Sequence, residues 1–182
     1  MIGQIEDLIR LKTERVFEAL DTDGNGYLEW ADFQSVVDRH LVEFQIDRAD
    51  PRGQAFQAAY ETFWAELSRH ADPDRDGRVS LEEYLVGTAA APETLYATSA
   101  AIGNALFEVI DTDGDGEVSL EEFVRMMCDV WGVPRADADA AFHKVDADGS
   151  GVLCRQEILT VAQEFLFATS VTAPGGGLAG SV

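Results

Sequence analysis

Basic residues are scarce in this sequence. Its 182 residues include 13 lysines and arginines against 34 aspartates and glutamates, and the formal net charge is −21. So acidic a chain is unsuited to binding nucleic acid and well suited to multivalent cations. Cysteine is also rare: Cys128 and Cys154 are the only two, without CxxC spacing, which excludes a disulfide framework and is ordinary in a reducing compartment.

Long apolar runs are missing as well. No stretch approaches the roughly eighteen consecutive apolar residues of a membrane helix, so we expect no membrane partner. Charged side chains such as Glu6, Arg10 and Lys12 interrupt the first twenty residues, which therefore do not form a signal peptide. Glycine is at position 3 and not 2, so the N-myristoylation pattern is absent. We expect a soluble, cytoplasmic protein.

A twelve-residue pattern occurs four times, starting at Asp21, Asp72, Asp111 and Asp146. Each copy has an acidic residue at positions 1 and 3, an oxygen-bearing residue at 5, glycine at 6, an aliphatic residue at 8 and a carboxylate at 12. This is the pattern of the calcium loop of an EF-hand. Four copies at similar spacing are not an accident of acidic composition.

The chemistry of Ca²⁺ explains each residue type that recurs in this pattern. The ion takes about 6 to 8 oxygens at roughly 2.3–2.6 Å, so the chain must wrap around it. Positions 1, 3, 5 and 12 supply side-chain oxygens, and the glycine turn directs the carbonyl of position 7 inward. The predicted ligands are Asp21, Asp23, Asn25, Tyr27 (carbonyl) and Asp32; Asp72, Asp74, Asp76, Arg78 (carbonyl) and Glu83; Asp111, Asp113, Asp115, Glu117 (carbonyl) and Glu122; Asp146, Asp148, Ser150, Val152 (carbonyl) and Glu157.

The four loops differ in ways that predict unequal sites. Asp32 is one methylene shorter than glutamate, so six-fold coordination and competition by Mg²⁺ are expected at the first loop. Pro73 restricts the preceding residue in the second loop, where Arg75 and Arg78 also offset negative charge. The third loop should bind most tightly. Cys154 is a poor ligand at position 9 of the fourth, although water often serves there. We expect three or four bound Ca²⁺.

Apolar residues recur at helical spacing on both sides of every loop. The predicted fold is therefore all-α: four EF-hands in two paired lobes, packed into one compact globule because the junction at residues 88–92 is short. Residues 1–90 should form one pair, with loops 21–32 and 72–83, and residues 91–170 the other, with loops 111–122 and 146–157. Residues 171–182 should be a flexible, glycine-rich tail. Short β-bridges should join the position-8 residues Leu28, Val79, Val118 and Leu153.

Four hands in 182 residues, with a long first interval and a short middle linker, resemble the sarcoplasmic calcium-binding proteins and their bacterial relative calerythrin. The resemblance covers residues 5–167. It implies a compact fold with the lobes packed together and a role as an intracellular calcium buffer. We expect a monomer, and no protein target is indicated.

Two other functions stay open at this point. A calcium sensor would open an apolar groove for a protein partner, and such grooves are rich in methionine; besides Met1 this chain has only Met126 and Met127. A photoprotein-like protein would hold a luciferin among its aromatic residues. No catalytic constellation is present, so we expect no enzyme. The three histidines and three tryptophans are expected in surface, structural or core positions: His40, His70, His143, Trp30, Trp64 and Trp131.

Overall fold

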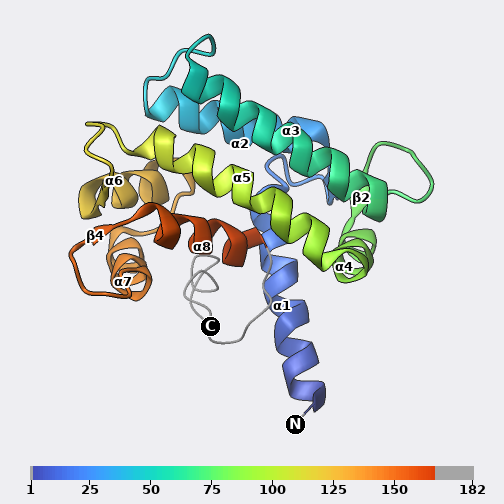
Figure 1. Ribbon diagram of the computed structural model, residues 1–182. Helices are drawn as coiled ribbons and strands as arrows, with labels where there is room; N and C mark the ends of the chain where they lie inside the picture. Colours follow the sequence, from blue (N-terminus) through green and yellow to red (C-terminus); the bar gives the residue numbers. More distant parts are fainter. Residues whose placement is uncertain (1, 167–182) are drawn as a thin grey trace.

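A helix lies on each side of every loop in the computed structural model, which describes residues 2–166 and, of these, the side chains from Arg10 onward (Figure 1). Only short strands interrupt the helices. The first half contains α1 (Ile2–Leu20), β1 (Tyr27–Leu28), α2 (Trp30–Glu43), α3 (Pro51–Ala71), β2 (Val79–Ser80) and α4 (Leu81–Ala90). The second half contains α5 (Pro92–Ile110), β3 (Val118–Ser119), α6 (Leu120–Arg125), the π-helical turn η1 (Met126–Val130), α7 (Arg135–Val145), β4 (Val152–Leu153) and α8 (Arg155–Leu166).

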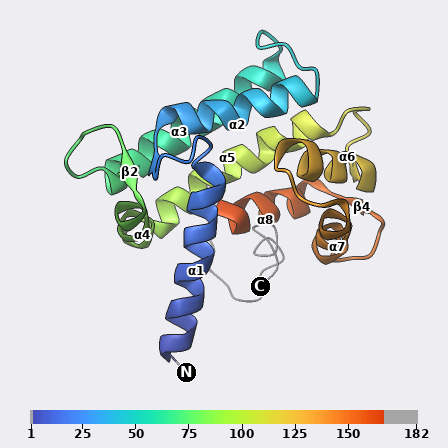
Figure 2. The same ribbon diagram turned by 180° about the vertical axis from the view of Figure 1, so that it is seen from behind.

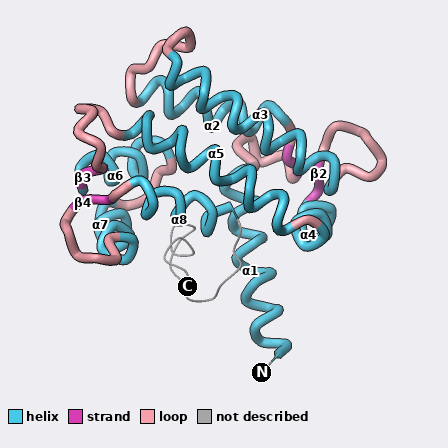
Figure 3. Tube along the Cα trace, in the orientation of Figure 1, coloured by secondary structure: helices cyan, strands magenta, loops and turns pink. Residues whose placement is uncertain are grey.

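The loops are joined in pairs by antiparallel strands. Leu28 of β1 lies opposite Val79 of β2, and Val118 of β3 lies opposite Leu153 of β4. All four side chains are fully buried. Figure 3 shows the two strand pairs at opposite ends of the molecule. The predicted bridges between position-8 residues are therefore confirmed.

The two EF-hand pairs pack against each other along α3 and α5, which lie side by side in Figures 1 and 2. A single residue, Ala91, separates α4 from α5, so the junction is as short as predicted. Contacts also cross between the pairs from α2: Arg125 Nε donates to Glu43 Oε1 at 2.7 Å, and Arg39 Nη1 donates to the carbonyl of Val130 at 3.3 Å. The predicted fold class is confirmed.

Two of the sequence predictions about organisation are not tested by these contacts. The division at residues 90 and 91 stays a prediction, and the tail, residues 171–182, lies outside the described residues. Within residues 2–166, no helix combines the length and apolar character needed to cross a bilayer.

Aromatic side chains fill the core. Phe33 lies within 5.3 Å of the Trp64 ring and 6.0 Å of the Phe63 ring, centroid to centroid. All three tryptophans are partly buried and pack against this core, as predicted. His40 is buried too: its ring lies edge-on to Trp131 at 5.8 Å, and burial lowers its pKa to about 4. The ring is therefore neutral at neutral pH.

The exit helix of the third hand departs from a regular α-helix. After α6 the backbone widens into η1 at Met126–Val130. A π turn shifts the helical phase, because it contains more residues than an α turn. Met126, Met127 and Val130 all end up in the core, with at most 3% of their surface exposed. The apolar spacing predicted a helix here but not this irregularity.

Candidate metal centres

Each predicted loop brings three carboxylates together. In every group the oxygens lie within 4.8 Å of one another, a separation suited to a shared cation. The groups are Asp21, Asp23 and Asp32; Asp72, Asp74 and Asp76; Asp111, Asp113 and Glu122; and Asp146, Asp148 and Glu157. Three groups contain the carboxylate of position 12, while the second loop's group does not contain Glu83.

A shared hydrogen bond shapes the first half of each loop. The glycine amide of position 6 donates to the Oδ2 of position 1, at 2.8–3.1 Å in the four loops. These glycines have φ between 82° and 86°, a left-handed conformation that glycine adopts without a steric penalty. The hydrogen bond holds the position-1 carboxylate against the glycine turn. The donors are Gly26, Gly77, Gly116 and Gly151.

The predicted ligands of position 5 lie in the same turn. Asn25 Oδ1 accepts from the Tyr27 amide at 2.8 Å, and Asp115 Oδ1 accepts from the Glu117 amide at 2.9 Å. In the fourth loop the Ser150 hydroxyl donates to the carbonyl of position 7. Positions 5 and 7 are therefore neighbours in these loops, as their shared role requires.

The carboxylate of position 12 connects the start of a loop to the helix that follows it. In the third loop, Glu122 Oε1 accepts from the Thr112 amide at 2.8 Å, and its Oε2 accepts from the Ser119 amide at 2.9 Å. Asp32 makes the same two backbone bonds with Thr22 and Glu29, at 2.9 and 2.8 Å. The fourth loop repeats them with Glu157, Ala147 and Cys154, both at 2.9 Å.

These hydrogen bonds also adjust the charge state of the loops. Desolvation raises the pKa of Glu122, but the hydrogen bonds from Thr112 and Ser119 outweigh it, so that the pKa is lowered overall. Hydrogen bonds from the hydroxyl and amide of Ser150 lower the pKa of Asp148. Both carboxylates therefore stay ionised at neutral pH, when a cation would compete with few protons.

The second loop lacks one of these bonds because of its proline. Position 2 is Pro73, which has no N–H to donate. Glu83 Oε2 accepts from the Ser80 amide at 2.9 Å, but within residues 2–166 no hydrogen bond joins its Oε1 to the start of the loop. The missing donor explains why Glu83 is absent from the carboxylate group of its loop.

Two further features distinguish the second loop. Position 4 is Arg75 with φ 60°, where the other loops have glycine, and this conformation is strained for a residue with a side chain. The amide of Asp76 lowers the pKa of Asp74, but desolvation and the charges of Asp76 and Glu83 outweigh it, so the pKa is raised. The second loop is therefore less well preorganised to bind a cation than the other three loops.

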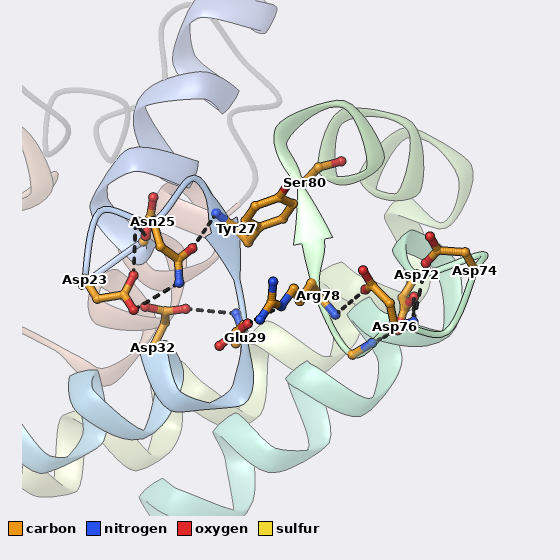
Figure 4. Close-up of polar contacts among 12 residues, drawn as sticks. Asp23, Asn25, Tyr27, Glu29, Asp32, Asp72, Asp74, Asp76, Arg78 and Ser80 are labelled. Atoms are coloured by element: carbon orange, nitrogen blue, oxygen red, sulfur yellow. Dashed lines mark hydrogen bonds and ion pairs between the residues drawn. The ribbon is translucent and has the colours of Figure 1, made fainter.

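An ion pair connects the first and second loops. Figure 4 shows Arg78 extending from the second loop toward the first. Its Nε lies 2.7 Å from Glu29 Oε1, and its guanidinium carbon is 5.7 Å from the centre of the Tyr27 ring. Both partners belong to the first loop, at positions 9 and 7. Arg78, whose carbonyl is the predicted ligand of position 7, therefore also joins the two loops through its side chain.

The sequence analysis assigned no role to two serines of position 9 and two threonines of position 2. Ser80 and Ser119 are the N-caps of α4 and α6, and each forms a reciprocal capping box with the glutamate three residues later. The pattern S-x-x-E before an apolar run is the signal that could have revealed them. Thr22 and Thr112 also donate their hydroxyls to the position-12 carboxylates. Each threonine meets a carboxylate ten residues later in the sequence, so its contribution is seen only in the folded loop.

Comparison with known proteins agrees with this geometry. A model described as an EF-hand domain pair matches residues 11–87, and one described as EF hand matches residues 104–127 and 138–162. The solved structure of a calcium-binding protein from Streptomyces coelicolor is 30% identical, with a TM-score of 0.76, and the match covers 87% of this chain and 99% of that one. This chain belongs to the EF-hand family of calcium-binding proteins.

Other EF-hand proteins are related over nearly the whole length. Calerythrin of Saccharopolyspora erythraea is 28% identical over 86% of this chain and 90% of its own. The structure of a sarcoplasmic calcium-binding protein from amphioxus has 26% identity and a TM-score of 0.72, covering 97% of this chain and 98% of that one. The resemblance predicted from loop spacing is thus confirmed.

The third loop gives a direct test of the ligand set. Glu122→Gln should remove one bound Ca²⁺ or weaken it more than about tenfold, because an amide offers one oxygen and no charge. Calorimetric titration gives the number of ions, and NMR of the Gly116 amide reports the loop. Glu121→Gln is the control, since Glu121 is exposed and paired with Arg135. Unchanged ion number and affinity in Glu122→Gln would refute the assignment.

Restoring the missing donor should strengthen the second loop. Pro73→Thr supplies the amide and hydroxyl present in the first and third loops, and one hydrogen bond to a charged group corresponds to roughly a tenfold gain in Ca²⁺ affinity. The Gly77 amide, which donates to Asp72, provides a local NMR signal. Pro92→Thr, at the start of α5, is a control outside the loops. Equal affinity in Pro73→Thr and the parent would show that the donor is unimportant.

Proposed function

We propose that this protein is a cytoplasmic calcium buffer that binds three or four Ca²⁺. The observation that carries the proposal is the burial of Met126 and Met127, because methionine is the residue type that lines the partner groove of a calcium sensor. Met126 and Met127 have 3% and 2% of their surface exposed and lie where the two EF-hand pairs meet. A sensor presents such residues to a partner helix. Here the chain covers them itself, which leaves ion binding as the main task.

The charge of the chain supports the same function. With a formal charge of −21, the loop carboxylates repel one another in the absence of cations. Each bound Ca²⁺ relieves this repulsion where it is strongest, so binding should stabilise the folded chain by mass action. Ion binding then stabilises the packed arrangement of the two EF-hand pairs and needs no rearrangement of one pair relative to the other.

Scattering and dye binding together test the buffer. The Ca²⁺-loaded protein should have a radius of gyration near ~16 Å, the value for a single compact domain of this length. An environment-sensitive dye, 1-anilinonaphthalene-8-sulfonate, should bind weakly with and without Ca²⁺. Two resolved lobes, or strong dye binding only in the Ca²⁺ form, would contradict the buffer and favour a sensor.

A calcium sensor is the second candidate. The Streptomyces coelicolor relative is described as acting in prokaryotic calcium-mediated regulation, and it matches most of this chain. A regulator of this kind would need a surface that changes with calcium. The same dye and scattering measurements therefore separate the two candidates.

A luciferin-binding function has weaker support. The apolar pocket where the two pairs meet has a volume of about 90 Å³. Sites for larger organic ligands usually occupy roughly 300–1,000 Å³. A multi-ring luciferin would require this core to expand, and we do not propose that function.

The first loop should be the one at which Mg²⁺ competes. Asp32 is only 3% exposed and makes the backbone bonds of a position-12 glutamate with a shorter side chain, so the loop closes tightly. Asp32→Glu should raise Ca²⁺ affinity and reduce competition, because both oxygens can then reach the larger ion. Ca²⁺ titrations in millimolar Mg²⁺ measure this, with Asp38→Glu in α2 as the control. No gain would mean that the backbone already compensates for the missing methylene.

A further inference from the structure

The exit helices of the first and third hands meet where the two EF-hand pairs pack together. The helix α2 leaves the first loop and contacts η1, which continues α6 after the third loop. Asp32 is the N3 residue of α2, and Glu122 is the N3 residue of α6. Each of these position-12 carboxylates therefore lies in the first turn of a helix whose far end contacts the other pair.

Arg125 of α6 holds the C-terminal end of α2. Its Nε donates to Glu43 Oε1 at 2.7 Å, and its Nη2 donates to the carbonyl of Glu43, the last residue of α2. Its guanidinium carbon lies 4.9 Å from the centre of the Phe44 ring. The last carbonyls of a helix lack partners within the helix and carry the negative end of its dipole, so a cation there is stabilising. The exit helix of the third hand thus caps the exit helix of the first.

Arg39 of α2 makes the reverse contact. Its Nη1 donates to the carbonyl of Val130, the last residue of η1, at 3.3 Å. Its guanidinium carbon lies 5.8 Å from the centre of the Trp131 ring. Four residues after Val130 the chain has Pro134, which has no N–H with which to continue the helical hydrogen bonds. The donor for this carbonyl comes instead from the other EF-hand pair, so each exit helix is capped by an arginine of the other.

The same arrangement of the two exit helices is compatible with closed loops at both ends. With the arginine contacts in place, Asp32 accepts from the Thr22 amide at 2.9 Å and Glu122 accepts from the Thr112 amide at 2.8 Å. A Ca²⁺ that fixes one of these carboxylates also fixes the first turn of its helix. Because the helices are held to each other, part of the ordering that the second loop needs is then already in place.

We propose that Arg39 and Arg125 are positioning residues that couple the first and third loops, so that Ca²⁺ bound at one loop raises the affinity of the other. The proposal rests on calcium binding at these two loops, and it applies to a buffer as well as to a sensor. The loop pairs lie at opposite ends of the molecule (Figure 3), where exposed charges are screened from each other, so the coupling passes through the contacts of α2 with α6 and η1.

The experiment compares the full-length parent protein with Glu122→Gln in Ca²⁺ titrations followed by NMR. The Gly26 amide, which donates to Asp21, reports the first loop, and the Gly116 amide, which donates to Asp111, reports the third. Loss of the third ion should raise the Ca²⁺ concentration at the midpoint of the Gly26 titration about fivefold or more. Because coupling is reciprocal, Asp32→Asn should raise the Gly116 midpoint by a similar factor, which a merely structural role of the arginines would not produce.

Arginine variants locate the coupling. In a protein that carries both Arg39→Gln and Arg125→Gln, adding Glu122→Gln should move the Gly26 midpoint by less than about twofold. Arg39 is exposed and the Arg125 side chain is 35% exposed, so these changes remove no core side chain.

Arg155→Gln is the matched control. Arg155 pairs with Glu108, donates to the carbonyl of Asn104 at 3.4 Å and lies 4.2 Å from the centre of the Phe107 ring. These are the same three kinds of contact that Arg125 makes, but all of them lie within the second EF-hand pair. The coupling should therefore persist in Arg155→Gln.

Each possible failure has a separate reading. An unchanged Gly26 titration in Glu122→Gln, with the Gly116 response lost, would overturn the coupling and leave the calcium sites in place; this comparison needs no arginine variant. Coupling that survives the loss of both arginines would overturn their role. A Gly116 titration that is the same in Glu122→Gln as in the parent would overturn the third-loop assignment, on which the proposal rests.

Discussion

The hydrogen bonds of the position-12 carboxylate hold the first, third and fourth loops closed, and the geometry of these three candidate sites depends on them. One oxygen accepts from position 2, near the start of the loop, and the other accepts from position 9, where the exit helix begins. The residue that is predicted to supply two metal ligands is therefore also the N3 residue of a capping box in α6. Helix capping and the predicted metal binding use the same side chain, so we expect the exit helix and the site to form together.

Much of the site could be predicted from sequence because its chemistry is local. Twelve consecutive residues supply the predicted ligands of one ion. The oxygen-bearing side chains that Ca²⁺ prefers, the glycine of the turn and the carboxylate at position 12 can all be identified in the amino-acid sequence. The pairing of Leu28 with Val79 also follows from the pattern, since an apolar position 8 needs a partner. Helical periodicity predicted the helices on either side of each loop.

Other features depend on contacts that no local pattern contains. Pro73 was interpreted through its effect on Asp72, whereas its main structural effect is a donor that Glu83 lacks ten residues later. The widening at Met126–Val130 lies where η1 contacts α2 of the other pair, and spacing along one helix does not specify it. His40 is polar and was expected in a surface or structural position; only the approach of Trp131 and Phe56 shows that it is buried.

The antiparallel packing of α3 and α5 places the two loop pairs at opposite ends of the molecule (Figure 1). Each pair lies near one end of α5, a helix of 19 residues, and such a helix is about 28 Å long. Ionic screening reduces interactions between exposed charges beyond about 8 Å at physiological salt. Ions within one pair can therefore influence each other through their charge and through contacts such as that of Arg78 with Glu29. Communication between the two ends would have to pass mechanically through the helical core, because the charges of the two loop pairs are screened from each other.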